Sequence, residues 1–108
     1  LDPRGRAQMS AIIRRTVGQG RRVVSSSHDI DLIYEVSDAV YVLRHGEVLA
    51  AGDPGEVFAC AETMDRAGLT QPWLVKLHSE LGLPLCKTEA EFFQRMHNNA
   101  IGAIKEAS

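Results

Sequence analysis

Residues 40–52 read VYVLRHGEVLAAG, and this stretch decides how the chain is interpreted. Two apolar runs, 39–43 and 48–51, flank the polar residues of segment 44–47. A very short polar connection between two apolar runs is typical of antiparallel strands, because it can only reverse the direction of the chain. The sequence therefore predicts a β-hairpin whose tip carries His45 and directs it into solvent.

The triplet Arg44-His45-Gly46 also resembles the signature of the histidine phosphatases, in which the histidine accepts a phosphoryl group and the arginine binds its oxygens. That chemistry needs a second arginine, a second histidine and an acid that converge on one phosphate. Matches of three residues are frequent by chance, and here Glu47 leads at once into an apolar strand. The hairpin is favoured, and a histidine phosphatase remains a remote alternative.

Composition and charge restrict the class of protein. A chain of 108 residues with 44% apolar and 24% charged residues is typical of one soluble globular domain at most. The net charge of −2 gives no electrostatic reason to expect nucleic acid as a partner. No stretch approaches the roughly 20 apolar residues of a membrane span, and nothing is typical of a signal peptide.

The residues that could bind a metal are scattered. Cys60 and Cys86 have neither zinc-knuckle nor redox-pair spacing, which predicts buried, reduced thiols of a cytosolic protein. His78 and His97 fall on predicted helices without acidic or thiol partners at ligand spacing, so we expect no metal site. Trp73 is interpreted as part of a helix core rather than as an anchor for a partner.

Upstream of the hairpin the pattern predicts helix, strand and helix. Asp2 can cap free N–H groups and Pro3 suits a first helical turn, so a helix begins there. The run 22–27 combines two valines with serines and predicts a short strand, and the segment DIDLIYEVS after His28 has helical periodicity. With 39–43 as the next strand, this order indicates an α/β domain with a partly parallel sheet.

Downstream of the hairpin the pattern predicts three short helices. The first follows Asp53, where Pro54 stands at the first helical position. The second begins near Pro72, and the third follows a capping box formed by Thr88 and Glu91. The residues after these helices have little patterning and are expected to fray.

Four segments, taken in order, resemble the end of the nucleotide-binding domain of ABC transporters. Leu1-Asp2-Pro3 resembles the end of the run that carries the D-loop of this family. Ser26-Ser27-His28-Asp29 resembles its H-loop, or switch histidine, and SDAVYVL at 37–43 is similar to the strand that follows. The hairpin then matches the pattern Leu-x-x-Gly-Glu-Val, strand, Gly-x-Pro-x-Glu-Val. The order and spacing of four segments are more specific than a single triplet.

The stretch GLTQPWLVKLHSELGLPLCKTEAEFF is similar to the C-terminal region of the cobalt-type ATPase subunits of energy-coupling-factor transporters, and the resemblance extends from Leu1 to about Met96. It implies an α/β fold: a partial sheet of the P-loop NTPase type, with a parallel strand plus the antiparallel hairpin, then a helical region. Residues 1–52 would be the C-terminal portion of the nucleotide-binding domain. Residues 53–97 would be a helical extension, and 98–108 a frayed tail.

The resemblance implies roles for two residues. His28 follows a predicted strand at the edge where α/β sheets bind ligands, and the resemblance implies that it contacts the γ-phosphate of ATP during hydrolysis. From the residues alone, a histidine that caps the following helix is an equal alternative, although Asp29 or Ser27 is the more natural cap. Asp2 is expected to cap its helix, and the resemblance adds a place for it at the dimer interface.

The motifs that bind a triphosphate are not in this sequence. It has no G-x-x-x-x-G-K-[ST] loop (Walker A), no Q-loop and no Leu-Ser-Gly-Gly-Gln-type signature, and the catalytic glutamate of the family would fall shortly before Leu1. The chain is therefore interpreted as the C-terminal part of an ATPase subunit that is inactive alone and binds no cofactor.

By the same resemblance, the intact subunit would bind Mg-ATP with a second ATPase subunit. It would act on a membrane coupling subunit at the cytoplasmic face of the bacterial inner membrane and drive cobalt uptake. Ion choice between cobalt and nickel is not made in this subunit. The strand 22–27 would lack neighbours in the isolated chain, which makes self-association a hypothesis. The alternative of another class is a non-catalytic regulatory or self-association domain.

Overall fold

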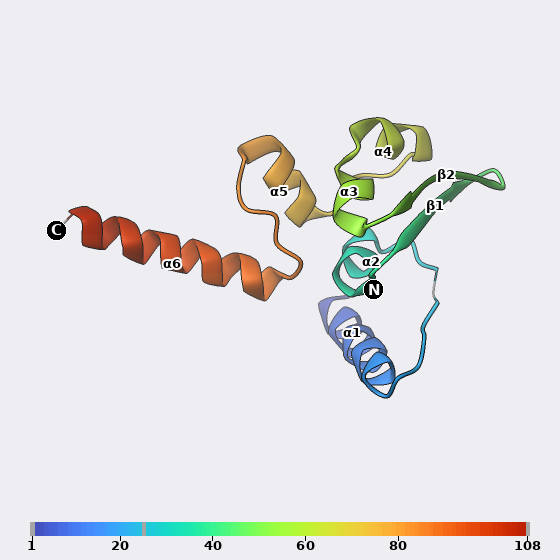
Figure 1. Cartoon of the computed structure of the whole chain (residues 1–108), viewed down its shortest axis with the longest axis horizontal. Helices are drawn as coiled ribbons and strands as arrows, with labels where there is room; N and C mark the ends of the chain where they lie inside the picture. Colours follow the sequence, from blue (N-terminus) through green and yellow to red (C-terminus); the bar gives the residue numbers. More distant parts are fainter. Residues whose placement is uncertain (1, 25, 108) are drawn as a thin grey trace.

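The computed structural model describes residues 2–24 and 26–107, and the side chains of 2–24 and 26–99. Within this part, helices flank one two-stranded sheet (Figure 1). The elements in chain order are α1 (Pro3–Gly18), α2 (Ile30–Val36), β1 (Val40–Arg44), β2 (Glu47–Gly52), α3 (Pro54–Ala59), α4 (Ala61–Ala67), α5 (Trp73–Leu81) and α6 (Glu89–Ala107). Among the described residues, no helix has the length and apolar character needed to cross a membrane.

The predicted hairpin is confirmed. Strands β1 and β2 pair antiparallel, with Arg44 opposite Glu47 at the closed end. His45 and Gly46 form the turn with φ angles of 50° and 76°. Two positive φ angles in a two-residue loop are typical of a type I′ turn, which suits the twist of the strands. His45 is exposed at this tip, as the sequence predicts.

The predicted parallel strand at 22–27 is not found in the described part of the chain. Residues 21–24 and 26–27 belong to no strand or helix, and Ser25 lies outside the described residues. The described sheet contains only β1 and β2. A strand exists only where a neighbour satisfies its backbone N–H and C=O groups, and no described strand lies beside this run. The observed fold is therefore a mostly helical α/β mixture with one antiparallel hairpin.

The region after the hairpin contains four described helices where the sequence predicts three. The helix that follows Asp53 ends at Ala59, because Cys60 takes an extended conformation and begins a second short helix. The break directs both Phe58 and Met64 into the core. Cys60 is exposed, so the prediction of a buried thiol is wrong there, whereas Cys86 is buried as predicted.

Helices α3 and α6 have the caps that the sequence predicts. The Asp53 carboxylate accepts a hydrogen bond from the N–H of Glu56, and Thr88 Oγ1 accepts one from the N–H of Glu91. Helix α6 continues to Ala107, through the segment 98–107 for which the sequence predicts a frayed tail. Figure 1 shows α6 extending away from the other elements. Fraying of that end stays a prediction.

The hydrophobic core lies between α2, the hairpin, α3 to α5 and the start of α6. The buried residues are Tyr34, Val40, Val42, Val57, Phe58, Met64, Leu74, Val75, Cys86 and Phe92. Within the core, the hydroxyl of Tyr34 donates a hydrogen bond to the carbonyl oxygen of Cys86 over 2.6 Å. This bond connects α2 to a segment far along the chain, between α5 and α6.

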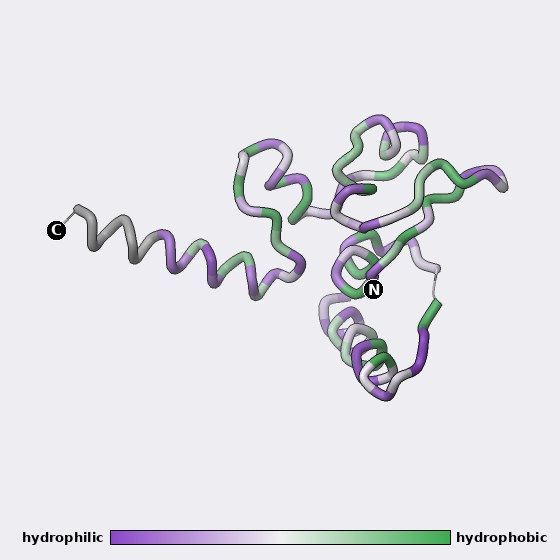
Figure 2. Tube along the Cα trace, viewed as in Figure 1, coloured by the Kyte–Doolittle hydropathy of each residue, from purple (hydrophilic) through white to green (hydrophobic). Residues whose placement is uncertain are grey.

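Helix α1 stays outside this core. Ser10 is its only described buried residue, whereas Met9, Ile12 and Val17 are 41%, 56% and 48% exposed. Figure 2 shows hydrophobic positions along α1 although the helix lies at the edge of the molecule. An amphipathic helix ordinarily buries such positions, so α1 presents an uncovered apolar surface.

Replacing Tyr34 with phenylalanine tests the connection between α2 and the C-terminal segment. Tyr34→Phe leaves the buried carbonyl of Cys86 without its donor, and we expect a loss of about 1–3 kcal/mol in the free energy of unfolding in urea. Tyr41→Phe removes an exposed hydroxyl and should change stability by less than about 0.5 kcal/mol. Equal losses for the two variants would contradict this description of the core.

Candidate functional site

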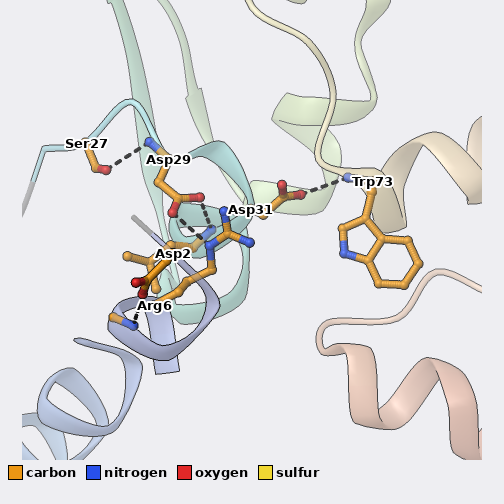
Figure 3. A network of polar contacts seen from close by, with 8 residues as sticks. Asp2, Arg6, Ser27, Asp29, Asp31 and Trp73 are labelled. Carbon is orange, nitrogen blue, oxygen red and sulfur yellow. Dashed lines mark hydrogen bonds and ion pairs between the residues drawn. The ribbon is translucent and has the colours of Figure 1, made fainter. Parts of the chain in front are cut away.

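His28 lies on the connection between α1 and α2, just before α2 begins, and its side chain is exposed. Its two neighbours are bonded to each other: the N–H of Asp29 donates to Ser27 Oγ over 2.9 Å (Figure 3). This bond closes a small turn around His28 without using its imidazole. The expectation that Asp29 is the natural cap is confirmed, because its Oδ1 accepts from the N–H of Leu32. The cap of α2 thus does not use the imidazole of His28.

Asp29 also forms an ion pair with α1. The Nε of Arg6 donates to Asp29 Oδ2 over 2.8 Å, and the Asp29 side chain is only 9% exposed. Burial by itself raises the pKa of Asp29, but the hydrogen bonds from Arg6 and from the N–H of Leu32 outweigh it and hold the pKa below its usual value of 3.8. The pairing therefore contributes its stability above that pH and loses it as the pH falls through the lowered pKa.

Asp2 caps α1 as predicted. Its Oδ1 accepts a hydrogen bond from the N–H of Gly5 over 2.7 Å, and its carbonyl accepts the first helical bond from the N–H of Arg6 over 2.9 Å. Leu1, the first residue of the predicted D-loop segment, lies outside the described residues. Asp2 and His28 are distant in the sequence, yet Arg6 and Asp29 connect the segments that carry them (Figure 3).

The start of α5 contacts the first turn of α2, on the side of α2 away from α1. Asp31 Oδ1 accepts a hydrogen bond from the N–H of Trp73 over 2.9 Å. Helix α5 has Pro72 at its N-cap position and receives no side-chain bond from it, so the carboxylate on α2 supplies the cap. Trp73 is 36% exposed and contacts Phe92 edge to face and Phe93 at a tilt, which places it at the edge of the core rather than inside it.

Arg44 of the opening triplet and His78 make contacts within the fold. The guanidinium of Arg44 donates to the carbonyl oxygen of Arg66 and so joins the hairpin to α4. The Nδ1 of His78 lies 2.7 Å from the carbonyl oxygen of Leu83, near the end of α5. Among the described residues, no cluster of histidines, cysteines and acids could bind a metal ion.

A groove of about 310 Å³ lies between α2, α3 and the start of α6. Its cation, Lys87, donates to the carbonyl oxygen of Ser37 over 2.8 Å and lies 4.8 Å from the centre of the Tyr34 ring. Burial lowers the pKa of Lys87 although the acidic groups Asp53 and Asp38 oppose the shift. The lysine is thus occupied by internal contacts, and the groove is part of the scaffold.

Sequence reasoning missed Arg6 and Asp31. Each lies on a predicted helix among other charged residues, and charge alone identifies no partner at long sequence separation. The signal available was that Asp29 and Asp31 flank the start of a helix.

Comparisons with known proteins first indicate the class. No family model and no solved structure matches the chain. The energy-coupling factor transporter ATP-binding protein EcfA of Carboxydothermus hydrogenoformans is 38% identical over 94 residues, which cover 83% of this chain and 34% of that protein. A putative ABC transporter ATP-binding protein of Listeria monocytogenes is 52% identical over 93 residues, 86% of this chain and 35% of that protein.

A more similar relative narrows the class. The cobalt import ATP-binding protein CbiO of Salmonella paratyphi A is 71% identical over 108 residues, which is 100% of this chain and 39% of that protein. The chain is therefore homologous to part of the ATP-binding subunit of cobalt and energy-coupling-factor importers. It spans 39% or less of the length of these three relatives.

The cap that α2 supplies to α5 can be tested with the single tryptophan of the chain. Asp31→Ala removes the acceptor for the N–H of Trp73, so we expect α5 to lose about 0.5–2 kcal/mol of local stability. Hydrogen exchange at Trp73 should accelerate, and tryptophan fluorescence should shift to longer wavelength. Glu35→Gln, on the same helix but paired with Arg14, should leave both signals unchanged. Unaltered exchange in Asp31→Ala would contradict this cap.

Proposed function

We propose that the chain is the C-terminal portion of the ATP-binding subunit of a bacterial cobalt importer, in which ATP hydrolysis drives uptake of the ion. The observation that carries this proposal is the 71% identity over the whole chain to a protein named for cobalt import. Residues 1–52 would complete the nucleotide-binding domain, 53–97 would form its helical extension, and 98–108 its frayed end.

In this proposal His28 acts on the terminal phosphate of Mg-ATP. A neutral imidazole donates one hydrogen bond to a γ-phosphate oxygen and accepts another from water or backbone, and an imidazolium adds positive charge where negative charge collects. Two features of the site support this role. The imidazole is exposed, and the turn that carries it is held by Ser27 and Asp29. The described residues contribute no phosphate-binding loop, which the rest of the subunit would supply.

Asp2 would lie across the interface with a second ATPase subunit and connect the two nucleotide sites. Its capping bond supports the role, because a capped loop keeps one position at the start of α1. The dimer would act on a membrane coupling subunit and reside at the cytoplasmic face of the inner membrane. The metal ion itself would be the cargo of the membrane partners.

The proposal also accounts for the surface that the described fold leaves uncovered. Residues 22–27 would pair as a parallel strand with a strand from the remainder of the subunit, and the apolar side of α1 would pack on that larger sheet. Val24 is 98% exposed in this chain, and Met9 and Ile12 are also exposed. Covering these side chains would remove their contact with water, which favours such a packing.

The same exposed residues favour one alternative of another class. A non-catalytic domain that associates with another copy of itself would cover α1 and Val24 equally well. That alternative assigns no chemistry to His28, so the two proposals differ in the effect of removing its imidazole.

ATP hydrolysis by the longer subunit tests the catalytic proposal. His28→Ala should lower kcat by roughly 100-fold or more, because a preorganised hydrogen bond to the transferring phosphate is lost in the transition state. His45→Asn is the matched control: it removes an exposed imidazole at the hairpin tip, and asparagine tolerates a positive φ. We expect less than about a twofold change for it. A phosphatase would show the opposite pattern, and the self-association alternative predicts no loss for either variant.

The isolated chain should bind ATP weakly and hydrolyse none. Most of a triphosphate's binding energy comes from a loop of backbone N–H groups and a lysine, and these residues contain no such loop. Isothermal titration calorimetry of the chain with Mg-ATP should therefore give no saturable heat at micromolar protein. A dissociation constant near about 1 μM, equivalent to about −8.2 kcal/mol, would contradict this.

A further inference from the structure

The turn that carries His28 is bonded on both sides of the histidine. Before it, Ser27 Oγ accepts from the N–H of Asp29; after it, Asp29 Oδ1 accepts from the N–H of Leu32 at the start of α2. The position of the His28 backbone is therefore determined by groups that belong to its two neighbours.

Arg6 extends this set of bonds to α1. Its N–H donates to the carbonyl oxygen of Asp2 over 2.9 Å, and its Nε donates to Asp29 Oδ2 over 2.8 Å. One residue thus touches both the segment that begins α1 and the turn around His28. Figure 3 shows the Arg6 guanidinium between the start of α1 and the start of α2.

We propose that Arg6 is a positioning residue: it transmits the position of Asp2 to His28 and so aligns the imidazole with the reacting phosphate. This inference rests on the proposed roles of His28 and Asp2. Arg6 itself contacts no substrate in this account and acts through Asp29.

The geometry of Asp29 makes this coupling stiff. Its two carboxylate oxygens bind different partners, Oδ1 the N–H of Leu32 and Oδ2 Arg6, so the carboxylate cannot rotate without losing a bond. The side chain is 9% exposed, so water replaces a lost partner poorly. A carboxylate left unpaired there would draw the turn toward solvent and displace His28, which is adjacent to it in the chain.

The test uses the full-length subunit assembled with its partner subunits. Arg6→Met keeps the aliphatic length and removes the charge and the hydrogen bond. We expect kcat for ATP hydrolysis to fall roughly 10- to 100-fold, as for a misplaced catalytic group. The KM for ATP should change less than about threefold, because the ground-state contacts with the nucleotide stay intact. Arg6→Lys, which retains the charge, should recover part of the loss.

Arg14→Met is the matched control. It removes the second ion pair between the same two helices, Arg14 to Glu35 over 3.2 Å, which lies beyond the turn of His28. We expect its kcat to stay within about twofold of the parent. Equal losses in Arg6→Met and Arg14→Met would indicate a general effect on the packing of α1 and would overturn the proposal.

Asp29→Asn tests the same link from its other end. The asparagine oxygen can still accept from the N–H of Leu32, but it no longer pairs as an anion with Arg6, so the fall in kcat should match that of Arg6→Met. This variant decides the question if Arg6→Met fails to fold. An unchanged kcat in Asp29→Asn would overturn the proposal.

A double-mutant cycle with His28→Ala separates positioning from stability. If Arg6 acts through His28, adding Arg6→Met to His28→Ala should lower kcat by less than about twofold more. A full additional loss would overturn the proposal. The outcomes also distinguish the two claims. An unchanged kcat in His28→Ala refutes the proposed function, whereas loss in His28→Ala with no loss in Arg6→Met refutes only this inference.

Discussion

The carboxylate of Asp29 is the point on which the arrangement of the N-terminal part of this chain depends. One of its oxygens begins α2 by accepting from the N–H of Leu32, and the other binds Arg6 of α1. Because α1 contributes almost nothing to the hydrophobic core, polar contacts are what orient it against α2. A part-buried, charge-assisted pair contributes more than the exposed pair of Arg14 and Glu35, which solvent screens.

Helix α2 connects two regions that differ in character. On one side it carries the turn of His28 and binds α1; on the other, Tyr34 enters the core and Asp31 caps α5. The helical region is therefore attached directly to the helix that follows the histidine. In the proposed subunit, a movement of α2 would displace both the turn of His28 and helix α5. The Cα radius of gyration of 16.1 Å exceeds the roughly 13 Å typical of a compact domain of this length, because α6 extends away from the other elements (Figure 1).

Much of the local structure was predictable because it depends on residues close in sequence. The hairpin follows from the two apolar runs on either side of the short polar segment with His45-Gly46. Asp2, Asp53 and Thr88 cap helices within three residues of themselves. The strand at 22–27 was not realised, because a strand depends on a distant neighbour rather than on its own composition. The break at Cys60 was missed for a similar reason, since core packing on both sides of it decides that position.

By itself, the sequence determined most of the elements, most of their caps, the turn and the resemblance from which the role of His28 was inferred. These features rest on local hydrogen bonds and on motifs that can be read along the chain. Only the tertiary structure decided the partners of the charged side chains: Arg6 binds Asp29, and Asp31 accepts from the backbone N–H of Trp73. Charged side chains are compatible with many partners of opposite sign. The choice among them is therefore made by the packing of α2, which places its first turn between α1 and α5.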